Sequence, residues 1–536
     1  MMLYSKIKKD CLPWAGRKLS TLIGLTGGLI AVCAAAQTAP ESLKPSDRPA
    51  AEVKVEPAAK SIVKILSVLR YPDLFQPWTK NAPVSSAASG VVIEGNRILT
   101  TAHAVAYASE LQIQANDNGD KVTATVEAFT PEVDLAVLKL DDNSFFASHP
   151  PLKRAARLPQ INDKITAWGF PADSTKLVSG SGKVVRIDYS SALGGSSLRI
   201  QMDSSVPSGA GGGAAMVGDT MIGLLVAPTS KTDKAGYIIS GEEIDSFLNA
   251  TRAGSYHGHP SLNLVLQGFK LPALRSFLGV DSSIHGVVVQ QVGPTPAGNP
   301  LREWDIITQV GKGDLDDDGT IALDNGIRVG FTYLLGKTVV DGKVPMTVVR
   351  SGKPMHVEVP VQTSPPRLLP GLDGVYPDYF VYGPIVFSDA SQDLFYNLVS
   401  TLVGGNSGVN GVVRLLQQDT PLATRCTDFP KFEGERLVVV TSFFQHKLSE
   451  GYPNPVSQVV KAINGIPIKN LAHLTQVLRD CKEKFVSIEF FGRYANTLVF
   501  PRAEMVASID TILTDNNVRS LGSPDIMAVW NAKKPE

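Results

Sequence analysis

Three segments of the sequence contain residues that together could perform acyl transfer. His103 follows one apolar run, Asp134 opens another, and a glycine-rich turn covers residues 209–213. In such a set the histidine takes a proton from a hydroxyl, and the aspartate fixes the imidazole tautomer and stabilises its charged form. Backbone N–H groups of the turn bind the developing oxyanion. The order of the three segments is that of a nucleophilic triad.

Two other sets of polar residues could be considered for metal binding. Residues 314–319 (DLDDDG) resemble the first half of a calcium loop, but the twelfth position is Asn325 instead of the bidentate Glu. We therefore expect a polar hairpin there. His257 and His259 have no third ligand in sight and are expected to be solvated. The sequence predicts no metal and no cofactor.

Length and composition limit the classes of function. A chain of 536 residues is long enough for three or four domains. The 51 basic residues balance the 51 acidic ones, which argues against a nucleic-acid-binding protein. The 47 glycines and 36 prolines suit a turn-rich β protein. Cys426 and Cys481 could form a disulfide in an oxidising compartment or be two buried small side chains, and the sequence leaves both open.

The N-terminal residues indicate a targeting segment. Residues 1–36 combine a basic leader, an apolar stretch and an Ala-rich exit, which is typical of a secretory signal peptide cleaved near Ala36. An uncleaved anchor and lipidation at Cys33 are the alternatives. The prediction is an exported protein, in a bacterial periplasm, with no stable membrane span after cleavage. Residues 37–60 are rich in Pro, Ala and charge and are predicted to be a linker.

From residue 61 to 250, short alternating runs are separated by turn residues. Residues 89–93 and 97–100 are predicted to form a hairpin across the loop 94–96. Many short strands with few helical periods favour an antiparallel barrel or sandwich. Further strands are predicted at residues 134–140, 164–169, 182–187, 198–203 and 221–227.

The remaining residues contain a weak internal repeat. The runs 287–289 and 306–313 are echoed by the runs 438–440 and 459–465. Two related small β domains are therefore plausible. In the second copy, Asn470 is a good N-cap for a helix whose apolar residues follow at helical spacing. A strand beside a helix can capture an extended peptide by adding a strand to the sheet edge.

Together these segments resemble the Deg/HtrA family of trypsin-like serine proteases, in particular the plant-type branch with two PDZ domains. The resemblance rests on Ile98-Leu99-Thr100-Thr101-Ala102-His103, Ser89-Gly90-Val91 and Pro77-Trp78, in addition to the Asp134 and 209–213 segments. It implies a mainly β fold with some α: a trypsin-like double β-barrel over 61–250, followed by PDZ-like α+β domains over 262–363 and 372–530. It also implies peptide-binding loops at Gln267, Gly268 and Phe269 and at Gly383, Pro384 and Ile385.

By the same resemblance, His103 corresponds to the general base and Asp134 to its orienting carboxylate. The family nucleophile lies in a Gly-Asn-Ser-Gly-Gly-Pro turn, eight residues after an aspartate. Eight residues after Asp203 the sequence has Gly211, so the nucleophile serine is absent. The flanking glycines keep the turn, and Gly209, Ala210 and Gly211 are predicted to form the oxyanion nest.

The sequence thus predicts a Deg/HtrA-like protein that lacks proteolysis and binds unfolded or extended polypeptides and protein C-termini in protein quality control. The enzyme alternative is an active serine endopeptidase that uses Ser208 or Ser205. A third interpretation is a purely structural cage component. The family implies a homo-oligomer, a trimer or a multiple of three. Tyr71, Phe75 and Trp78 are candidate contacts for that assembly or core residues under the first barrel.

Overall fold

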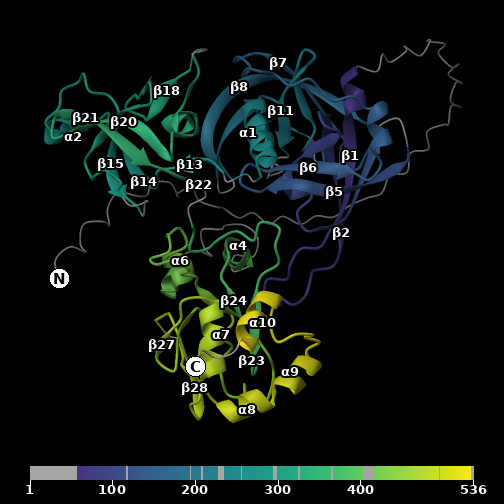
Figure 1. Cartoon of the computed structure of the whole chain (residues 1–536), viewed down its shortest axis with the longest axis vertical. Helices are drawn as coiled ribbons and strands as arrows, with labels where there is room; N and C mark the ends of the chain where they lie inside the picture. Colours follow the sequence, from purple (N-terminus) through teal and green to yellow (C-terminus); the bar gives the residue numbers. More distant parts are fainter. Residues whose placement is uncertain are drawn as a thin grey trace, which may run out of the picture. The chain divides into compact units, whose positions relative to one another are not determined.

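The computed structural model describes the chain from residue 57 to residue 532. Within this range it leaves out residues 116–118, 193–194, 207–208, 227–234, 255, 257, 294–297, 324–325, 364–365, 402–414 and 494. The predicted signal peptide and most of the predicted linker therefore lie outside the described residues. No helix in the described part is long and apolar enough to cross a bilayer. Figure 1 shows the elements along the chain.

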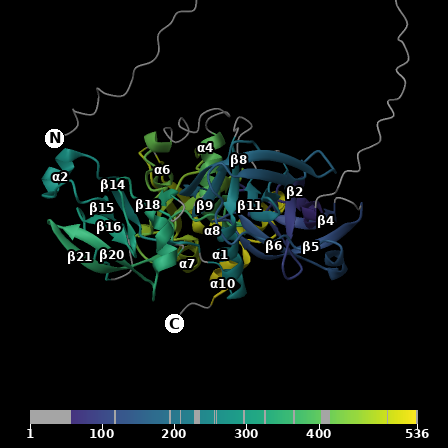
Figure 2. The ribbon, with the colours of Figure 1, turned by 90° about the horizontal axis from the view of Figure 1, so that it is seen from above.

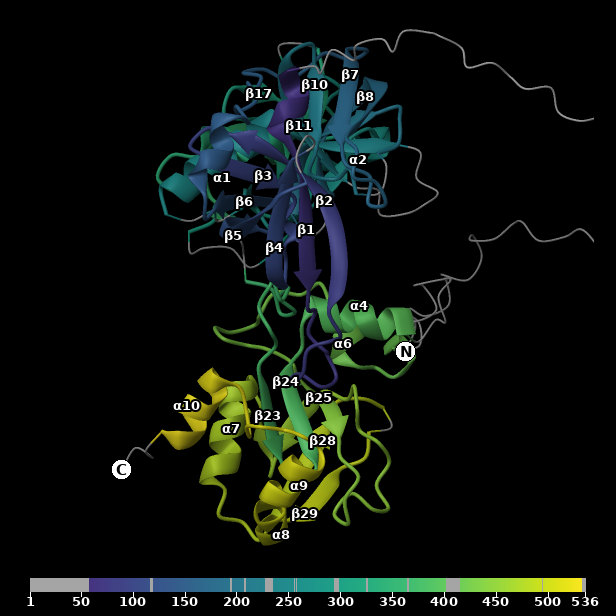
Figure 3. The ribbon, with the colours of Figure 1, turned by 90° about the vertical axis from the view of Figure 1, so that its right-hand side faces the viewer.

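A closed barrel follows the 3-10 helix η1, which begins four residues before the predicted domain start. Its strand order is β1-β2-β3-β6-β5-β4. The predicted hairpin is present, since Val91 pairs with Leu99, and β1 and β2 run side by side (Figure 3). The elements are η1 (Pro57–Ser61), β1 (Ile62–Leu69), β2 (Val84–Ile93), β3 (Arg97–Thr100), η2 (Ala102–Ala104), β4 (Ala108–Ala115), β5 (Lys121–Thr130), β6 (Leu135–Leu140) and η3 (Asn143–Ala147).

A second closed barrel follows, with the order β10-β11-β12-β9-β8-β7. Helix α1 follows β12 and packs against this barrel. Ser240 caps the helix by accepting a hydrogen bond from the Glu243 N–H at 3.3 Å. The two barrels confirm the predicted mainly β, double-barrel fold. The elements are β7 (Lys164–Gly169), β8 (Val178–Ala192), β9 (Gly195–Met202), β10 (Ala214–Val217), β11 (Thr220–Val226), β12 (Gly236–Ser240) and α1 (Gly241–Arg252).

The third region is built on one sheet with the order β14-β15-β16-β20-β21, in which β14 is an edge strand (Figure 2). Its core is continuous with that of the second barrel, through residues such as Ile187 and Val329. The elements are β13 (Pro260–Ser261), β14 (Leu264–Gly268), α2 (Pro272–Leu278), β15 (Val287–Val292), β16 (Ile306–Val310), β17 (Gly313–Asp314), β18 (Thr320–Ala322), β19 (Arg328–Gly330), η4 (Phe331–Leu334), α3 (Leu335–Thr338), β20 (Lys343–Arg350), β21 (Lys353–Pro360) and β22 (Gln362–Thr363).

The C-terminal region contains the sheets β23-β24-β25 and β27-β26-β28-β29. Asn470 caps α7 by accepting from the His473 N–H at 2.8 Å, as predicted. The repeat is imperfect: β15 and β16 share one sheet, whereas β25 and β26 are joined by a single bridge, Val439 to Val459. The elements are β23 (Tyr379–Tyr382), β24 (Ile385–Asp389), α4 (Gln392–Thr401), α6 (Pro421–Thr424), β25 (Val438–Phe443), β26 (Val460–Ile463), β27 (Ile466–Pro467), α7 (Leu471–Asp480), β28 (Phe485–Phe490), β29 (Leu498–Pro501), α8 (Arg502–Ala507), α9 (Ile509–Asp515) and α10 (Pro524–Asn531).

The segment between β1 and β2 packs against the C-terminal region. The Trp78 ring lies 6.2 Å from that of Tyr379 and 5.5 Å from that of Phe444, centroid to centroid. Phe75 packs against the cluster that contains Leu368 and Leu394. Phe75 and Trp78 therefore do not form the core under the first barrel that was one of the two expectations. Both rings are partly buried, and they pack against another region of the chain.

Candidate functional site

The structure brings His103 and Asp134 into direct contact at the ends of two paired strands. Thr100 of β3 lies opposite Ala136 of β6, so the residues just beyond these positions meet. The His103 Nδ1 lies 3.0 and 2.9 Å from the two carboxylate oxygens of Asp134. The backbone N–H of His103 also donates to Asp134 Oδ1 at 3.0 Å. The carboxylate therefore holds His103 in two ways, through the ring Nδ1 and through the backbone N–H.

The environment of this pair suits a histidine base that is held in one orientation by a buried carboxylate. The Asp134 side chain is 5% exposed, while that of His103 is 55% exposed. Partial burial lowers the pKa of His103, but the hydrogen bond and the charge of Asp134 outweigh it and leave the pKa raised. With Nδ1–H donating to Asp134, the neutral ring has its acceptor at Nε2. Among the described residues, no group forms a hydrogen bond with this Nε2 atom.

The glycine turn is held tightly against the first barrel. Ser89 of β2 donates its N–H to the Gly211 carbonyl at 2.9 Å and its hydroxyl to the Gly209 carbonyl at 3.0 Å. A Cβ on Gly212, whose φ is +84°, would lie 2.1 Å from the Ser89 carbonyl oxygen and 2.7 Å from Thr100 Oγ1. Only glycine fits there. The turn of the second barrel thus sits against the strand that leads to His103.

The polar groups of the turn are used unevenly. The carbonyls of Gly209, Ala210 and Gly211 accept hydrogen bonds from Ser89 and from the Gly213 N–H. Their three N–H groups find no acceptor among the described residues. Free N–H groups on a fixed turn are what an oxyanion nest requires. The oxyanion nest at Gly209, Ala210 and Gly211 stays a prediction.

The predicted nucleophile position contains no hydroxyl. Gly211 is buried, and its φ is not among the positive values that Gly209 and Gly212 adopt. Of the two serines considered as substitutes, Ser205 is exposed and Ser208 lies outside the described residues. The structure therefore contains an oriented base and a fixed turn, without an alcohol at position 211 to activate.

The predicted peptide-binding residues of the third region lie at a sheet edge. Gln267 and Gly268 belong to β14, for which β15 is the only partner strand in the described part of the chain. Gln267 accepts a hydrogen bond from Gln290 at 2.6 Å. Phe269 is fully buried, and its N–H donates to the Asp317 carbonyl at 2.8 Å. The peptide-binding role of Gln267, Gly268 and Phe269 stays a prediction.

The predicted peptide-binding residues of the C-terminal region are buried. Gly383, Pro384 and Ile385 form the turn and first residue between β23 and β24, and the Pro384 carbonyl accepts from the Phe444 N–H at 2.7 Å. The outer edge of β23 is covered by the chain's own residues 521–523. Val381 donates to the Leu521 carbonyl at 2.7 Å. The Trp530 ring of α10 packs 5.2 Å from that of Phe380.

The other predicted features have separate outcomes. Asp316 accepts from Thr320 and Arg328, as a polar hairpin requires. No metal-binding cluster of His, Cys, Asp or Glu occurs in the described part of the chain. His259 is not solvated as expected: its Nε2 lies 2.6 Å from buried Glu243, whereas His257 lies outside the described residues. Cys426 and Cys481 are free, half-buried thiols.

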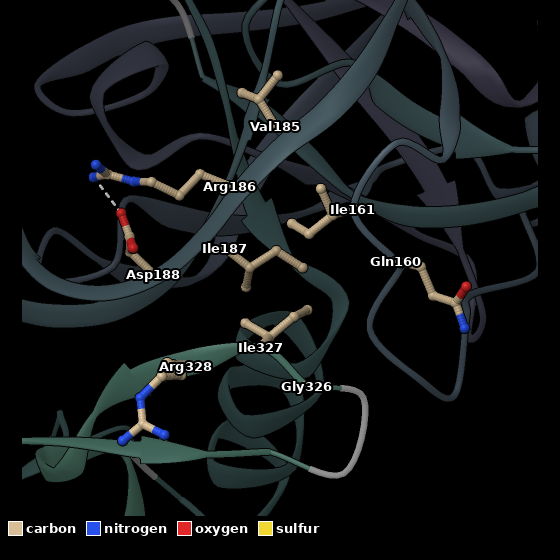
Figure 4. A pocket seen from close by; sticks show the side chains of 9 residues that line it. All are labelled: Gln160, Ile161, Val185, Arg186, Ile187, Asp188, Gly326, Ile327 and Arg328. Atoms are coloured by element: carbon tan, nitrogen blue, oxygen red, sulfur yellow. Dashed lines mark ion pairs between the residues drawn. The ribbon is translucent and has the colours of Figure 1, made fainter. Parts of the chain in front are cut away.

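A cavity of about 580 Å³ lies between β8 and the β18–β19 hairpin. Its apolar residues include Ile161, Ile187 and Ile327 (Figure 4). Its two arginines are already neutralised, since Arg186 pairs with Asp188 and Arg328 with Asp316. The cavity therefore offers no unpaired charge that would select a ligand.

Two residues near the His103–Asp134 pair were missed by the sequence reasoning. Ser89 was noted only as part of the motif, although it fixes the glycine turn. Arg199 was not noted at all, although its buried guanidinium lies beside the Asp134 turn. Arg199 alternates with apolar residues, as Gln201 does, so the local pattern gave no signal that its side chain is buried.

Comparisons with known proteins agree with this arrangement. Residues 88–224 match the family model of the trypsin-like peptidase domain, and residues 373–525 match that of the PDZ domain. Protease Do-like 2, chloroplastic, of Arabidopsis thaliana is 28% identical over 474 residues, which cover 87% of this chain and 75% of that protein. The chain is a Deg/HtrA protease homologue.

Further relatives of this Deg/HtrA homologue are similar over most of their length. Protease Do-like 4, mitochondrial, of Arabidopsis thaliana is 28% identical over 84% of this chain and 83% of that protein. A solved structure of the HtrA-type protease AlgW with a decapeptide covers 58% of this chain and 98% of its own, at 21% identity and a TM-score of 0.45. The names of the two Arabidopsis relatives place them in organelles and lend no support to the predicted bacterial periplasm.

Proposed function

We propose that this Deg/HtrA homologue binds unfolded or extended polypeptides without cleaving them. The observation that supports this most strongly is Gly211, which supplies no hydroxyl to the oriented base His103. Removing the serine of a comparable triad lowers kcat by about 10⁶-fold. The rate that remains comes from binding and the oxyanion nest and is too low for a working protease.

The β14 edge is the part of the molecule best suited to capture a polypeptide. An unpaired strand edge offers a row of backbone donors and acceptors, and an extended segment satisfies them by adding a strand. Val265 on β14 and Leu271 just beyond it are exposed and provide apolar contacts for alternate side chains. In the C-terminal region the outer edge of β23 already pairs with residue 521, so we assign peptide capture to the third region.

The experiment that tests this function uses the purified full chain with unfolded casein and a fluorophosphonate. We expect binding of casein, no serine-linked label and no fragments. Labelling together with turnover would overturn the proposal and favour an active endopeptidase that uses Ser205 or Ser208. Absence of both cleavage and binding of carboxylate-ended peptides would favour the purely structural cage component instead.

Assembly and location complete the proposal. We propose a homo-oligomer, a trimer or a multiple of three. Light scattering of the purified protein measures its molar mass and tests this directly. A monomer at micromolar concentration would contradict it.

We also propose that residues 1–36 direct export and are removed, as their basic leader and apolar stretch indicate. N-terminal sequencing of the mature protein decides this, and an intact leader or an organelle-type cleavage site would contradict it.

A further inference from the structure

Arg199 is a buried cation at the boundary between the two barrels. It lies in β9 of the second barrel and is only 7% exposed. Its Nη2 donates to the carbonyl of Val133 at 3.4 Å, and Nε donates to Ser197 Oγ at 2.9 Å. Val133 directly precedes Asp134, so the guanidinium contacts the turn that supplies the carboxylate for His103.

Two carboxylates act on the buried charge of Arg199. Burial lowers the pKa of this guanidinium, while the nearby charges of Asp134 and Glu243 act in the opposite direction. Glu243 of α1 is itself buried and accepts from the Leu198 N–H at 2.7 Å. Nearby carboxylates offset part of the cost of burying an arginine.

The groups beyond Glu243 extend this arrangement to the connector after α1. His259 lies 2.6 Å from the second carboxylate oxygen of Glu243. Tyr256 and Tyr189 pack against the His259 ring at 6.2 and 5.8 Å. Besides Asp134 and Arg199, the titratable groups that face this cluster are therefore Glu243, His259, Tyr189 and Tyr256. Glu132 lies near Tyr256, and Glu242 and Tyr333 lie near Tyr189.

The Asp134 turn needs an external support. Asp134 has a φ of +62°, in the left-handed region that aspartate occupies less readily than glycine. Its own N–H makes one turn bond, to the Pro131 carbonyl at 3.2 Å. Such a conformation persists when its surroundings hold it. The neighbouring carbonyl of Val133 is the atom that Arg199 binds from the other barrel.

We propose that Arg199 is a positioning residue, which holds the Val133–Asp134 turn so that the carboxylate keeps its two contacts with His103. Its role is geometric in the first place, and the nearby carboxylate of Glu243 offsets part of the cost of burying its charge. The second barrel then contributes Arg199 to the site in addition to the glycine turn. The proposal concerns the His103–Asp134 pair itself, so it stands apart from whether the protein cleaves or only binds polypeptides.

The test is the titration of the His103 ring in the full chain, followed by the ring Cε1–H signal in NMR spectra. The chain has eight histidines, and His103→Gln identifies the signal by its loss. The variants are Arg199→Gln, which removes the charge, and Arg199→Lys, which keeps the charge but loses the planar fork. Arg186→Gln is the matched control, because Arg186 is an exposed arginine of the same barrel.

We expect both Arg199 variants to lower the pKa of His103 towards its ordinary value of about 6.5, because a loosened carboxylate stabilises the imidazolium less. The control should leave it unchanged. A purely electrostatic role predicts the reverse: Arg199→Gln would raise the pKa, since a repelling cation is gone, and Arg199→Lys would leave it as it is. That pattern, or no shift in either variant, would overturn the proposal. If Arg199→Gln does not fold, Arg199→Lys alone decides between the two.

Discussion

Ser89 and Gly211 belong to different barrels, yet the N–H of Ser89 donates to the carbonyl of Gly211 at 2.9 Å. The next contact follows directly, since Thr100 donates its hydroxyl to the Ser89 carbonyl at 2.7 Å. Thr100 lies three residues before His103. The glycine turn and the histidine are therefore linked through one serine of β2, and the backbone for a catalytic centre remains in place although position 211 has no side chain.

The substitution Gly211→Ser tests whether this centre is still competent. The φ of Gly211 is not in the left-handed region, so a serine fits the backbone. We expect fluorophosphonate labelling and casein cleavage at least about 10²-fold above the matched variant Gly211→Ala, since an oriented base contributes about 10²–10⁴. Equal inertness of both folded variants would mean that the nest or the base has also been lost.

The tight fit of the turn predicts a large loss of stability for Gly212→Ala. A methyl group there would lie 2.1 Å from the Ser89 carbonyl oxygen, at a φ of +84°. Gly218→Ala is the control, because Gly218 has a φ of +57° but nothing within 4 Å of the added carbon. We expect about 1 kcal/mol of destabilisation for the control, from φ alone, and clearly more for Gly212→Ala. Equal unfolding free energies in urea would contradict the contact.

The stability of the C-terminal region should depend on pH through Asp389. Burial raises the pKa of this carboxyl to about 6, against the hydrogen bond from the Leu471 N–H and the charge of Arg436. The folded state therefore prefers the protonated acid. The contribution to stability is fully present below about pH 4, the unfolded value, and is lost as the pH rises through about 6.

Asp389→Asn removes this dependence, because the amide stays neutral and its oxygen still accepts from Leu471. We expect the variant and the wild type to have similar free energies of unfolding in urea at pH 4. At pH 7 the variant should be the more stable of the two. Exposed Asp515, changed to Asn, serves as the control and should follow the wild type. If the free energies of unfolding of Asp389→Asn and the wild type change with pH in parallel across this range, Asp389 is not the group responsible.

Trp78 provides a test of the contact between the β1–β2 segment and the C-terminal region. Its ring packs on Tyr379 and Phe444, so Trp78→Ala removes both contacts. We expect a loss of about 2–3 kcal/mol in the unfolding of that region and no change in oligomeric state. Phe432→Ala, at an exposed ring of the C-terminal region, is the control. Dissociation of the oligomer in the Trp78 variant would show that this residue acts in assembly instead.

Strands and caps were predictable where the local pattern was strong. The hairpin of β2 and β3, the strand β7 at Lys164–Gly169 and the Asn470 cap of α7 all follow from alternation or from a capping residue within a few positions. The state of His259 was not predictable, because its partner Glu243 lies sixteen residues away on a helix. A short polar segment looks solvated until its partner is known.

By itself, the sequence determined which residue types are present: a histidine, an aspartate and a turn with glycine at position 211, in that order. Only the tertiary structure decided that Asp134 contacts His103, that Arg199 supports the Asp134 turn, and that residue 521 covers the edge of β23. Chemical identity is local to each residue, whereas these contacts join positions that are 31, 66 and 140 residues apart. Such contacts depend on how the strands close and pack, which no local pattern encodes.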